Sequence, residues 1–302
     1  MLDFPNMAKN LHRILRVIKC SCIIFLAVSS LQAEGFRSEA SRDIEEKFQL
    51  ARKYLRGDGV EKDASHALTL MEEAATRGHP DAMGGVGFFY AEGLGVARDP
   101  ALATSWYRMG AENGSAKSMY NLGQNLLRGR GVEKNTQEGL QWLEKASSQG
   151  LPEAQLACGE IYFWGTDNQP RDFVKAFPYF QNAAKSDVLK AQNLLGLCYR
   201  DGFGTSTDHQ LAEEWFRRAA ERNDPKAQSN LAHLLGVTSA GLDQSPKKVE
   251  ALKWLIISSN QKEITAVKSL NVIRPTLDPK LLAAGEKAAS DFEMQQSLSE
   301  NR

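Results

Sequence analysis

The feature that most constrains this chain is a period of about 36 residues that three independent sets of positions share. The first set is the leading glycine of a recurring turn, as in "YAEGLGV" at 90–96, and a bulky and a small residue recur in step with it. The sets are Gly57, Gly93, Gly129, Gly165 and Gly202; Leu70, Trp106, Trp142, Tyr179 and Trp215; and Ala82, Ser118, Ala154, Ala191 and Ala227. One ligand site cannot produce this spacing, so the glycines indicate a stacked-repeat architecture.

A single copy of the repeat, residues 116–150, predicts two helices joined by a glycine turn. Met119, Leu122 and Leu126 recur at helical spacing in its first half. Gly129 ends that helix because glycine adopts positive φ at little steric cost. The second half predicts another helix with the periodic tryptophan turned inward. A pair of this length cannot bury its own apolar face, so neighbouring pairs must stack on it.

The repeated pattern A-x-x-x-L-G-x-x-Y-x-x-G-x-G-V, followed by A-x-x-W-x-x-x-A-A-x-x-G, resembles the Sel-one-like repeats, which are relatives of the tetratricopeptide repeat. This resemblance implies an all-α fold, an α/α solenoid with a right-handed superhelix and a C-terminal capping helix. We expect six copies, at 47–81, 82–117, 118–153, 154–190, 191–226 and 227–265. Residues 34–46 would form a short linker or cap, and 266–302 a helical cap beginning near Asp278-Pro279 with a frayed tail.

Two copies depart from the pattern at the turn. The fourth carries Gly165-Thr166-Asp167-Asn168 in place of Gly-x-Gly-Val, and its turn can survive because Asn and Asp tolerate left-handed backbone. The sixth has a longer turn that contains Ser, Gly and Pro. We therefore expect the sixth turn to be the loosest of the six.

The first 33 residues differ in character from the rest. Four basic residues precede "CSCIIFLAVSSLQA", an apolar run too short to span a membrane, and Ala33 is a plausible cleavage point. We interpret residues 1–33 as a signal peptide, which makes the protein exported, periplasmic or secreted, with no transmembrane segment after cleavage. The alternatives are a true start at Met7 or an Arg-rich transit peptide.

Charge balance excludes a strong electrostatic footprint for nucleic acid. The chain has 37 basic and 37 acidic residues. Loss of residues 1–33 removes four basic residues and one acidic residue, which leaves 33 against 36. The partner is therefore not expected to be a polyanion.

Cleavage would leave two cysteines, Cys158 and Cys198, on the first helices of adjacent repeats. An exported protein meets oxidising surroundings, so a disulfide is one interpretation. The other is that both are small buried apolar residues, because a bridge needs Cα atoms within about 7 Å.

Enzymatic and cofactor chemistry find little support in the sequence. No two histidines lie at metal-ligand spacing, and the Gly-x-Gly turns follow helices rather than strands, so we expect no metal site and no cofactor. Some cysteine-rich secreted relatives are associated with weak β-lactam hydrolysis. Here no activated Ser and no Ser-x-x-Lys in a suitable setting is evident, since "SEAS" at 38–41 and "SPKK" at 245–248 lie in segments expected to be flexible. We therefore expect a non-enzymatic protein and keep β-lactam hydrolysis as an alternative.

Resemblance to tetratricopeptide domains implies that the first helices line a concave groove that binds a protein or peptide partner. The candidate contact residues are Phe88, Tyr120, Gln124, Arg128, Glu160, Phe163, Trp164, Asn193 and Arg200. Trp164 occupies a position where other copies carry a charge, so it indicates either a binding surface or packing into the irregular fourth turn. Adaptor or scaffold activity is the expected function, and binding of cell-wall glycan by the same aromatics is a second alternative.

Overall fold

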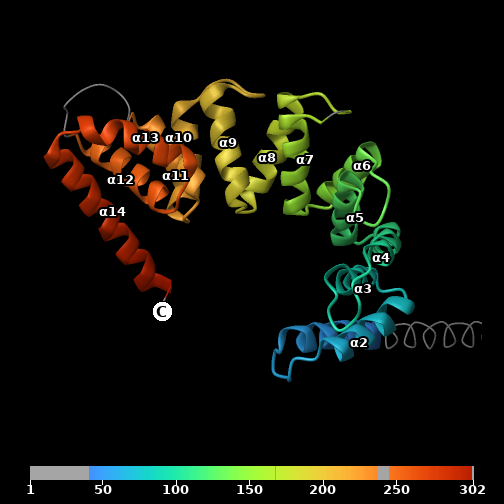
Figure 1. Ribbon diagram of the computed structural model, residues 1–302. Coiled ribbons are helices and arrows are strands. Elements are labelled where there is room, and N and C mark those ends of the chain that lie inside the picture. The colour runs from blue at the N-terminus through green and yellow to red at the C-terminus, as the bar shows by residue number, and fades with distance from the viewer. Residues whose placement is uncertain (1–40, 167, 237–244, 301–302) are drawn as a thin grey trace, which may run out of the picture. The chain divides into compact units, whose positions relative to one another are not determined.

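The structure, a computed structural model, describes residues 41–166, 168–236 and 245–300 (Figure 1). Every regular element in these ranges is helical, which confirms the predicted all-α fold, and a single β-bridge joins Thr166 to Gln169. Residues 41–56 form a helix. The later helices are α2 (Ala64–Thr76), α3 (Pro80–Glu92), α4 (Pro100–Glu112), α5 (Ala116–Arg128), α6 (Thr136–Ser148), α7 (Pro152–Trp164), α8 (Phe173–Lys185), α9 (Leu189–Asp201), α10 (His209–Glu221), α11 (Pro225–Leu234), α12 (Pro246–Asn260), α13 (Ile264–Ile273), the 3₁₀ helix η1 (Arg274–Thr276) and α14 (Pro279–Glu300).

Two of the sequence-based expectations fall outside the part of the chain that the structure describes. The predicted signal peptide, residues 1–33, is one of them. Most of the turn expected to be the loosest, residues 237–244, is the other.

Glycine ends the first helix of a repeat, as the sequence predicts. Gly93 and Gly202 cap α3 and α9 in the left-handed conformation, with φ of 73° and 75°. The irregular fourth turn differs, because Gly165 follows α7 with a positive φ of 72° but a ψ of 172°, which lies outside the left-handed helical region. Two backbone hydrogen bonds between Thr166 and Gln169, one in each direction, then close that turn.

A second periodic device starts the second helix of each of the first five repeats. An Asp or Asn side chain accepts a hydrogen bond from one or two backbone N–H groups of the first turn, which satisfies donors that the helix itself cannot pair. These N-caps are Asp63, Asp99, Asn135, Asp172 and Asp208. They repeat with the same 36- or 37-residue interval as the glycines.

Close packing of the two helices within a repeat depends on a glycine in the middle of the first. A Cβ atom at Gly159 would lie 2.6 Å from the ring of Phe180, and one at Gly196 would lie 2.6 Å from the ring of Phe216. Gly87 meets Tyr107 in the same way at 2.8 Å. No side chain larger than hydrogen fits at this crossing without movement of the opposite ring.

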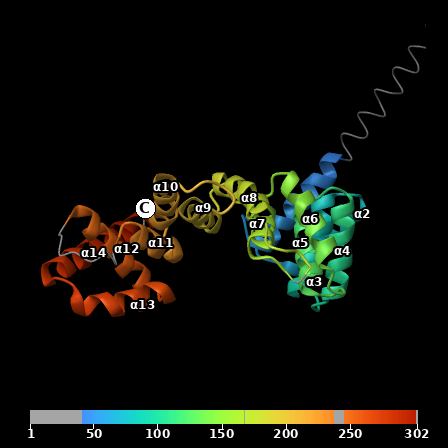
Figure 2. The ribbon, with the colours of Figure 1, turned by 90° about the horizontal axis from the view of Figure 1, so that it is seen from above.

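The chain divides into two compact units, with the boundary inside α5. Within the described residues, the first unit comprises 41–118 and 130–132, and its core joins the 41–56 helix to α2 and α3 around Met71 and Phe89. The second unit comprises 119–129 and 133–300. Both views of this second unit show α7 beside α8 and α9 beside α10 (Figures 1 and 2).

The second unit has two core clusters and a closing helix. One cluster is built on α7, α8 and α9, and the other on α10, α11 and α12. Helix α14 packs on α12, where Trp254 meets Phe292 edge to face at 4.9 Å between ring centroids. The side chain of Asp278 caps α14 close to the predicted start, and the helix continues to Glu300.

The structure corrects the expected role of the periodic tryptophans. Trp254 is buried, but Trp106, Trp142 and Trp215 are only half-buried. The buried position is the next residue along each helix, which supplies the ring or branched chain that meets the central glycine, as Tyr107 does. Two of the half-buried indoles contact cations, since Lys145 lies 4.0 Å from the centroid of the Trp142 ring and Arg218 lies 4.8 Å from that of Trp215.

The open question about Cys158 and Cys198 is also answered. Both residues are buried and both are free thiols, so the disulfide interpretation is wrong for this structure. Burial raises the pKa of the Cys158 thiol to about 12, with a further contribution from Glu144. Burial likewise raises the pKa of the Cys198 thiol to about 12, assisted by Asp201. A thiol with so high a pKa is a poor nucleophile at neutral pH.

Candidate partner-binding site

Four helices of the second unit line a cavity of about 600 Å³, here called the α7–α13 cavity. Helices α7, α9 and α11 are the first helices of successive repeats, and α13 is the next helix in that series. The repeat therefore places equivalent helix faces side by side at this site. On α9 the lining residues Lys190, Asn193, Leu194 and Leu197 follow the i, i+3, i+4, i+7 spacing of one helix face.

Apolar side chains at the two ends of this series are unusually exposed. Trp164, the last residue of α7, is 54% exposed, and Ile264, the first residue of α13, is 69% exposed. The Trp164 ring meets the buried Phe163 edge to face at 4.6 Å, which gives it support from below. Exposed large apolar residues that gather around one cavity are typical of a binding surface.

Between these ends lies a polar floor on α9 and α11. The Asn230 Nδ2 donates a hydrogen bond of 2.8 Å to the Oδ1 of Asn193, a side chain that is only 5% exposed. The adjacent Ser229 is 3% exposed, and its Oγ has no hydrogen-bond partner among the described residues. A buried hydroxyl without a partner carries a desolvation cost of about 1–3 kcal/mol. A bound ligand that reached this hydroxyl would remove that cost.

Charged residues surround this polar floor, and most of them already form an ion pair or a hydrogen bond within the protein. Glu160 forms an ion pair of 2.5 Å with Lys190. Glu263 is the N-cap of α13 and accepts the backbone N–H of Ala266 at 2.6 Å. Lys226, in the first turn of α11, is exposed and makes no ion pair within the part of the chain that the structure describes.

Three of the residues predicted from the sequence lie together at this cavity, namely Glu160, Trp164 and Asn193. Phe163, another candidate contact residue, does not line this cavity. It is 3% exposed and packs against the rings of Phe173, Phe180 and Phe203 in the α7–α9 core. One residue of helical rotation separates the buried Phe163 from the exposed Trp164.

The other predicted residues lie elsewhere. Arg200 forms a bidentate pair with Asp201, at 2.8 and 2.7 Å, and does not line the cavity. Phe88 belongs to the first unit and is 41% exposed. Tyr120, Gln124 and Arg128 lie on α5, where Tyr120 packs against the α7–α9 core and burial raises the pKa of its hydroxyl.

Sequence reasoning missed most of the residues that line the cavity, among them Lys190, Lys226 and Ile264. A signal for the lysines was present, since Lys190 and Lys226 are 36 residues apart and occupy the same repeat position. Ile264 had no such signal, because it begins a helix that lies beyond the recognisable motif. Its exposure follows from tertiary placement alone.

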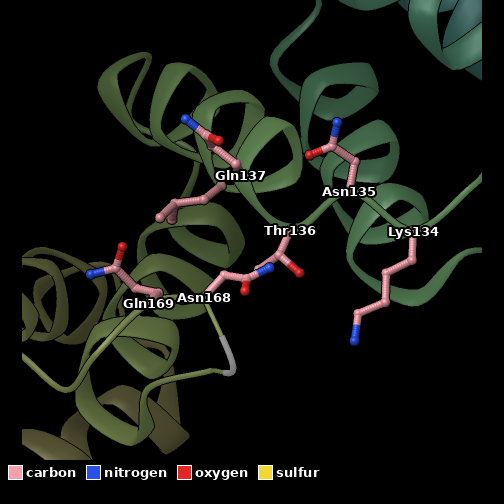
Figure 3. A pocket seen from close by; sticks show the side chains of 7 residues that line it. Lys134, Asn135, Thr136, Gln137, Asn168 and Gln169 are labelled. Atoms are coloured by element: carbon pink, nitrogen blue, oxygen red, sulfur yellow. The ribbon is translucent and has the colours of Figure 1, made fainter.

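A second cavity, of about 580 Å³, lies where α6 begins, near the fourth turn, and Figure 3 shows its side chains. Apart from Leu140 it is lined by polar groups, which are Lys134, Asn135, Thr136, Gln137, Asn168 and Gln169. Asn135 is already used, since its Oδ1 caps α6 by accepting the Glu138 N–H at 3.0 Å. No aromatic ring is among these lining residues, so this cavity offers no stacking surface to a sugar.

Neither a metal site nor a membrane-spanning helix is found in the ranges that the structure describes. The histidines there have structural roles. His79 caps α3 by accepting the Ala82 N–H, and His233 contacts Ser229 O and Ser269 Oγ. The chemistry available at the α7–α13 cavity is therefore recognition by hydrogen bonds, apolar contact and charge.

Comparison with known protein families identifies the Sel1 repeat. The Sel1 repeat model matches six consecutive segments, 47–79, 80–115, 116–151, 152–188, 189–224 and 225–262. The expected number of repeats and their type are therefore confirmed.

Curated relatives match over a shorter stretch. Chitin synthase regulatory factor 3 of Schizosaccharomyces pombe is 28% identical over 113 residues, which is 37% of this chain and 12% of that protein. Chitin synthase regulator SKT5 of Malassezia restricta is 32% identical over 95 residues, which is 31% of this chain and 7% of that protein. This chain thus spans only a small part of the length of either relative.

Solved structures support the fold. A protective antigen present in uropathogenic Escherichia coli strains, described as displaying an SLR fold, aligns with a TM-score of 0.70 at 24% identity. The alignment covers 85% of this chain and 56% of that one. A Sel1 repeat protein from Oxalobacter formigenes aligns with a TM-score of 0.61 at 28% identity, over 73% of this chain and 86% of that one.

Proposed function

Because the chain belongs to the Sel1 repeat family, we propose that it is an exported, non-enzymatic interaction module that binds a peptide segment of a protein partner in the α7–α13 cavity. It would act as an adaptor or scaffold. Export rests on the character of residues 1–33, with basic residues ahead of a short apolar run and a small-residue cleavage point.

One observation carries this proposal. Trp164 and Ile264 stay exposed at the ends of a cavity whose floor holds a buried, unpartnered hydroxyl at Ser229. Exposed apolar surface and an unsatisfied buried polar group both destabilise the free protein. A partner that covers the exposed apolar side chains and forms a hydrogen bond with the Ser229 hydroxyl would offset both of these unfavourable terms. Large aromatic anchors beside desolvated polar groups are typical of interaction hot spots.

A peptide fits this surface better than a glycan. Asn193 and Asn230 present amide donors and an acceptor, which can pair with the C=O and N–H of a peptide unit. Leu197 and Ile264 add aliphatic surface that sugar hydroxyls would not complement. Helical repeats bind extended segments by this combination of backbone hydrogen bonds and side-chain contacts.

Several features support a role without catalysis. Ser245 and Lys248, which have the Ser-x-x-Lys spacing of the β-lactam alternative, line neither cavity. The two buried thiols have raised pKa values. The names of the two fungal relatives describe regulators, which is also the kind of role proposed here.

The test is affinity capture from extracts of the source cell by three forms of the full chain. The first is unchanged, the second carries Trp164→Ala with Ile264→Asp, and the third carries Val174→Asp. Val174 is a matched control, because it is 73% exposed on α8 and lines neither cavity. Circular dichroism would check that all three forms are folded.

The proposal expects a protein that is captured by the unchanged chain and the Val174 variant but lost with the double variant. Equal capture by all three forms would place the partner elsewhere. Retention of isolated cell-wall glycan, with the same dependence on Trp164, would favour the glycan alternative. Turnover of a chromogenic β-lactam would refute the non-enzymatic role.

A further inference from the structure

We infer that the peptide segment bound at the α7–α13 cavity carries an acidic residue, which pairs with Lys226, with an apolar residue on either side of it. This inference rests on the proposed function and adds the chemistry of the partner.

The acidic residue follows from the charges at the cavity. Four charged side chains line it, two lysines and two glutamates. Lys190 and Glu160 neutralise each other at 2.5 Å, and the Glu263 carboxylate is held by the N-terminus of α13. Lys226 makes no ion pair among the described residues, so it is the charged side chain at the site that is left to pair with a ligand.

Lys226 lies beside the polar floor on α11. It is the second residue of that helix, and the N-cap Asp224 already satisfies this helix end by accepting the Ala227 N–H at 2.7 Å. The group at this end that is open to an anion is therefore the Lys226 ammonium. Ser229 and Asn230 follow at i+3 and i+4, which puts all three residues on the same face of the helix.

The polar floor next to Lys226 indicates that the ligand is a peptide and not a free anion. The bond from Asn230 Nδ2 to Asn193 Oδ1 uses neither the Asn193 amide hydrogens nor the Asn230 Oδ1, which could therefore pair with a ligand. One donor and one acceptor side by side match one peptide unit. The adjacent Ser229 Oγ is buried and has no partner among the described residues, so it could form a further hydrogen bond with the peptide.

The flanking apolar residues follow from the order of the helices. Trp164 lies on α7 and Ile264 on α13, whereas Lys226 lies on α11 between them in the series. A segment that crosses all four helices meets an apolar surface, then the amide floor and the lysine, then a second apolar surface. An acidic residue flanked by apolar residues is the sequence that satisfies these contacts in turn.

Selection from a random 12-residue peptide library displayed on phage tests this chemistry directly, with the full chain as the target. Three variants would be screened in parallel. Lys226→Glu reverses the charge at the site. Lys268→Glu makes the same change in net charge at an exposed residue of α13 that does not line the cavity. Trp164→Ala removes the aromatic contact.

We expect the unchanged chain and the Lys268 variant to enrich acidic peptides with flanking apolar residues. The Lys226 variant should lose that enrichment and select basic residues at the same place. A synthetic copy of an enriched peptide should bind it about 10- to 100-fold more weakly, because a single charge-assisted hydrogen bond is worth about 1.5–3 kcal/mol.

Enriched peptides that lack acidic residues, or that bind the Lys226 variant unchanged, would overturn this inference. If such peptides still required Trp164, peptide binding at the cavity would stand without the acidic preference. Failure to enrich any peptide, or enrichment indifferent to Trp164, would overturn both the inference and the proposed function.

Discussion

The close crossing of helices at Gly196 makes a quantitative prediction about stability. A Cβ atom at this residue would lie 2.6 Å from two ring carbons of Phe216, well inside van der Waals contact. Overpacking a core in this way costs about 1–3 kcal/mol. Alanine also favours the helix over glycine by about 0.8–1 kcal/mol. Gly196→Ala should therefore destabilise the protein by a net amount of up to about 2 kcal/mol.

A double-mutant cycle with Phe216→Ala separates the two effects. Leucine would not serve, because a Cβ at Gly123 already meets the Leu143 Cγ at 2.8 Å in the equivalent crossing. Alanine removes every ring atom that the new methyl group would meet, so Gly196→Ala should become stabilising in that background by about 0.8–1 kcal/mol. The coupling free energy between the two sites should then be about 1–3 kcal/mol. Urea denaturation followed by circular dichroism measures all four forms. A coupling below about 0.3 kcal/mol, within the range of independent sites, would refute the packing account.

Three further predictions follow from the same structure. Gly204→Ala should strongly destabilise the protein, because φ is +74° and the new Cβ would lie 2.1 Å from a carbonyl oxygen. Gly150→Ala, at φ of +84° with no atom within 4 Å of the new Cβ, should cost only about 1 kcal/mol of stability. Thermal melts would measure both variants. Burial acts to raise the pKa of the Glu250 carboxyl, but the hydrogen bond and the charge of Arg217 outweigh burial, so the pKa is lowered. The stability that this pair contributes is present above the ordinary carboxyl pKa and is lost as pH falls through the lowered value. Glu250→Gln should therefore make stability against urea less sensitive to acid between about pH 5 and 3. Native protein at pH 8 should react slowly with a thiol-specific disulfide reagent at both buried cysteines and fast in urea, and fast labelling of the native form would contradict their raised pKa values.

The repeat made the fold highly predictable from the sequence. Its period fixed the number of helix pairs, and the turn glycines marked where the first helices end, since positive φ is a local property that Gly93 or Gly202 sets alone. The Asp and Asn caps carried a signal of the same strength, because they recur with the same interval. Both devices depend on neighbours in the chain, and such features can be inferred without a structure.

The candidate site was only partly predictable, because exposure depends on packing between repeats. Phe163 and Trp164 are adjacent in sequence and similar in chemistry, yet one lies in an aromatic core and the other at a cavity. A helix rotates 100° per residue, so a small error in register exchanges inside for outside. Ile264 and the unpartnered Ser229 became visible only once α11 and α13 were placed together.

Site-specific photo-crosslinking in the source cell tests the central claim most directly. A photoreactive benzoylphenylalanine would replace Ile264 in one form and Val174 in another, and both forms would be irradiated and their cross-linked products identified by mass spectrometry. The account predicts a protein cross-linked through residue 264 and not through residue 174, with the attached fragment being a segment that contains an acidic residue between apolar ones. The same protein cross-linked equally well through both residues, or through residue 174 alone, would contradict partner binding at the α7–α13 cavity.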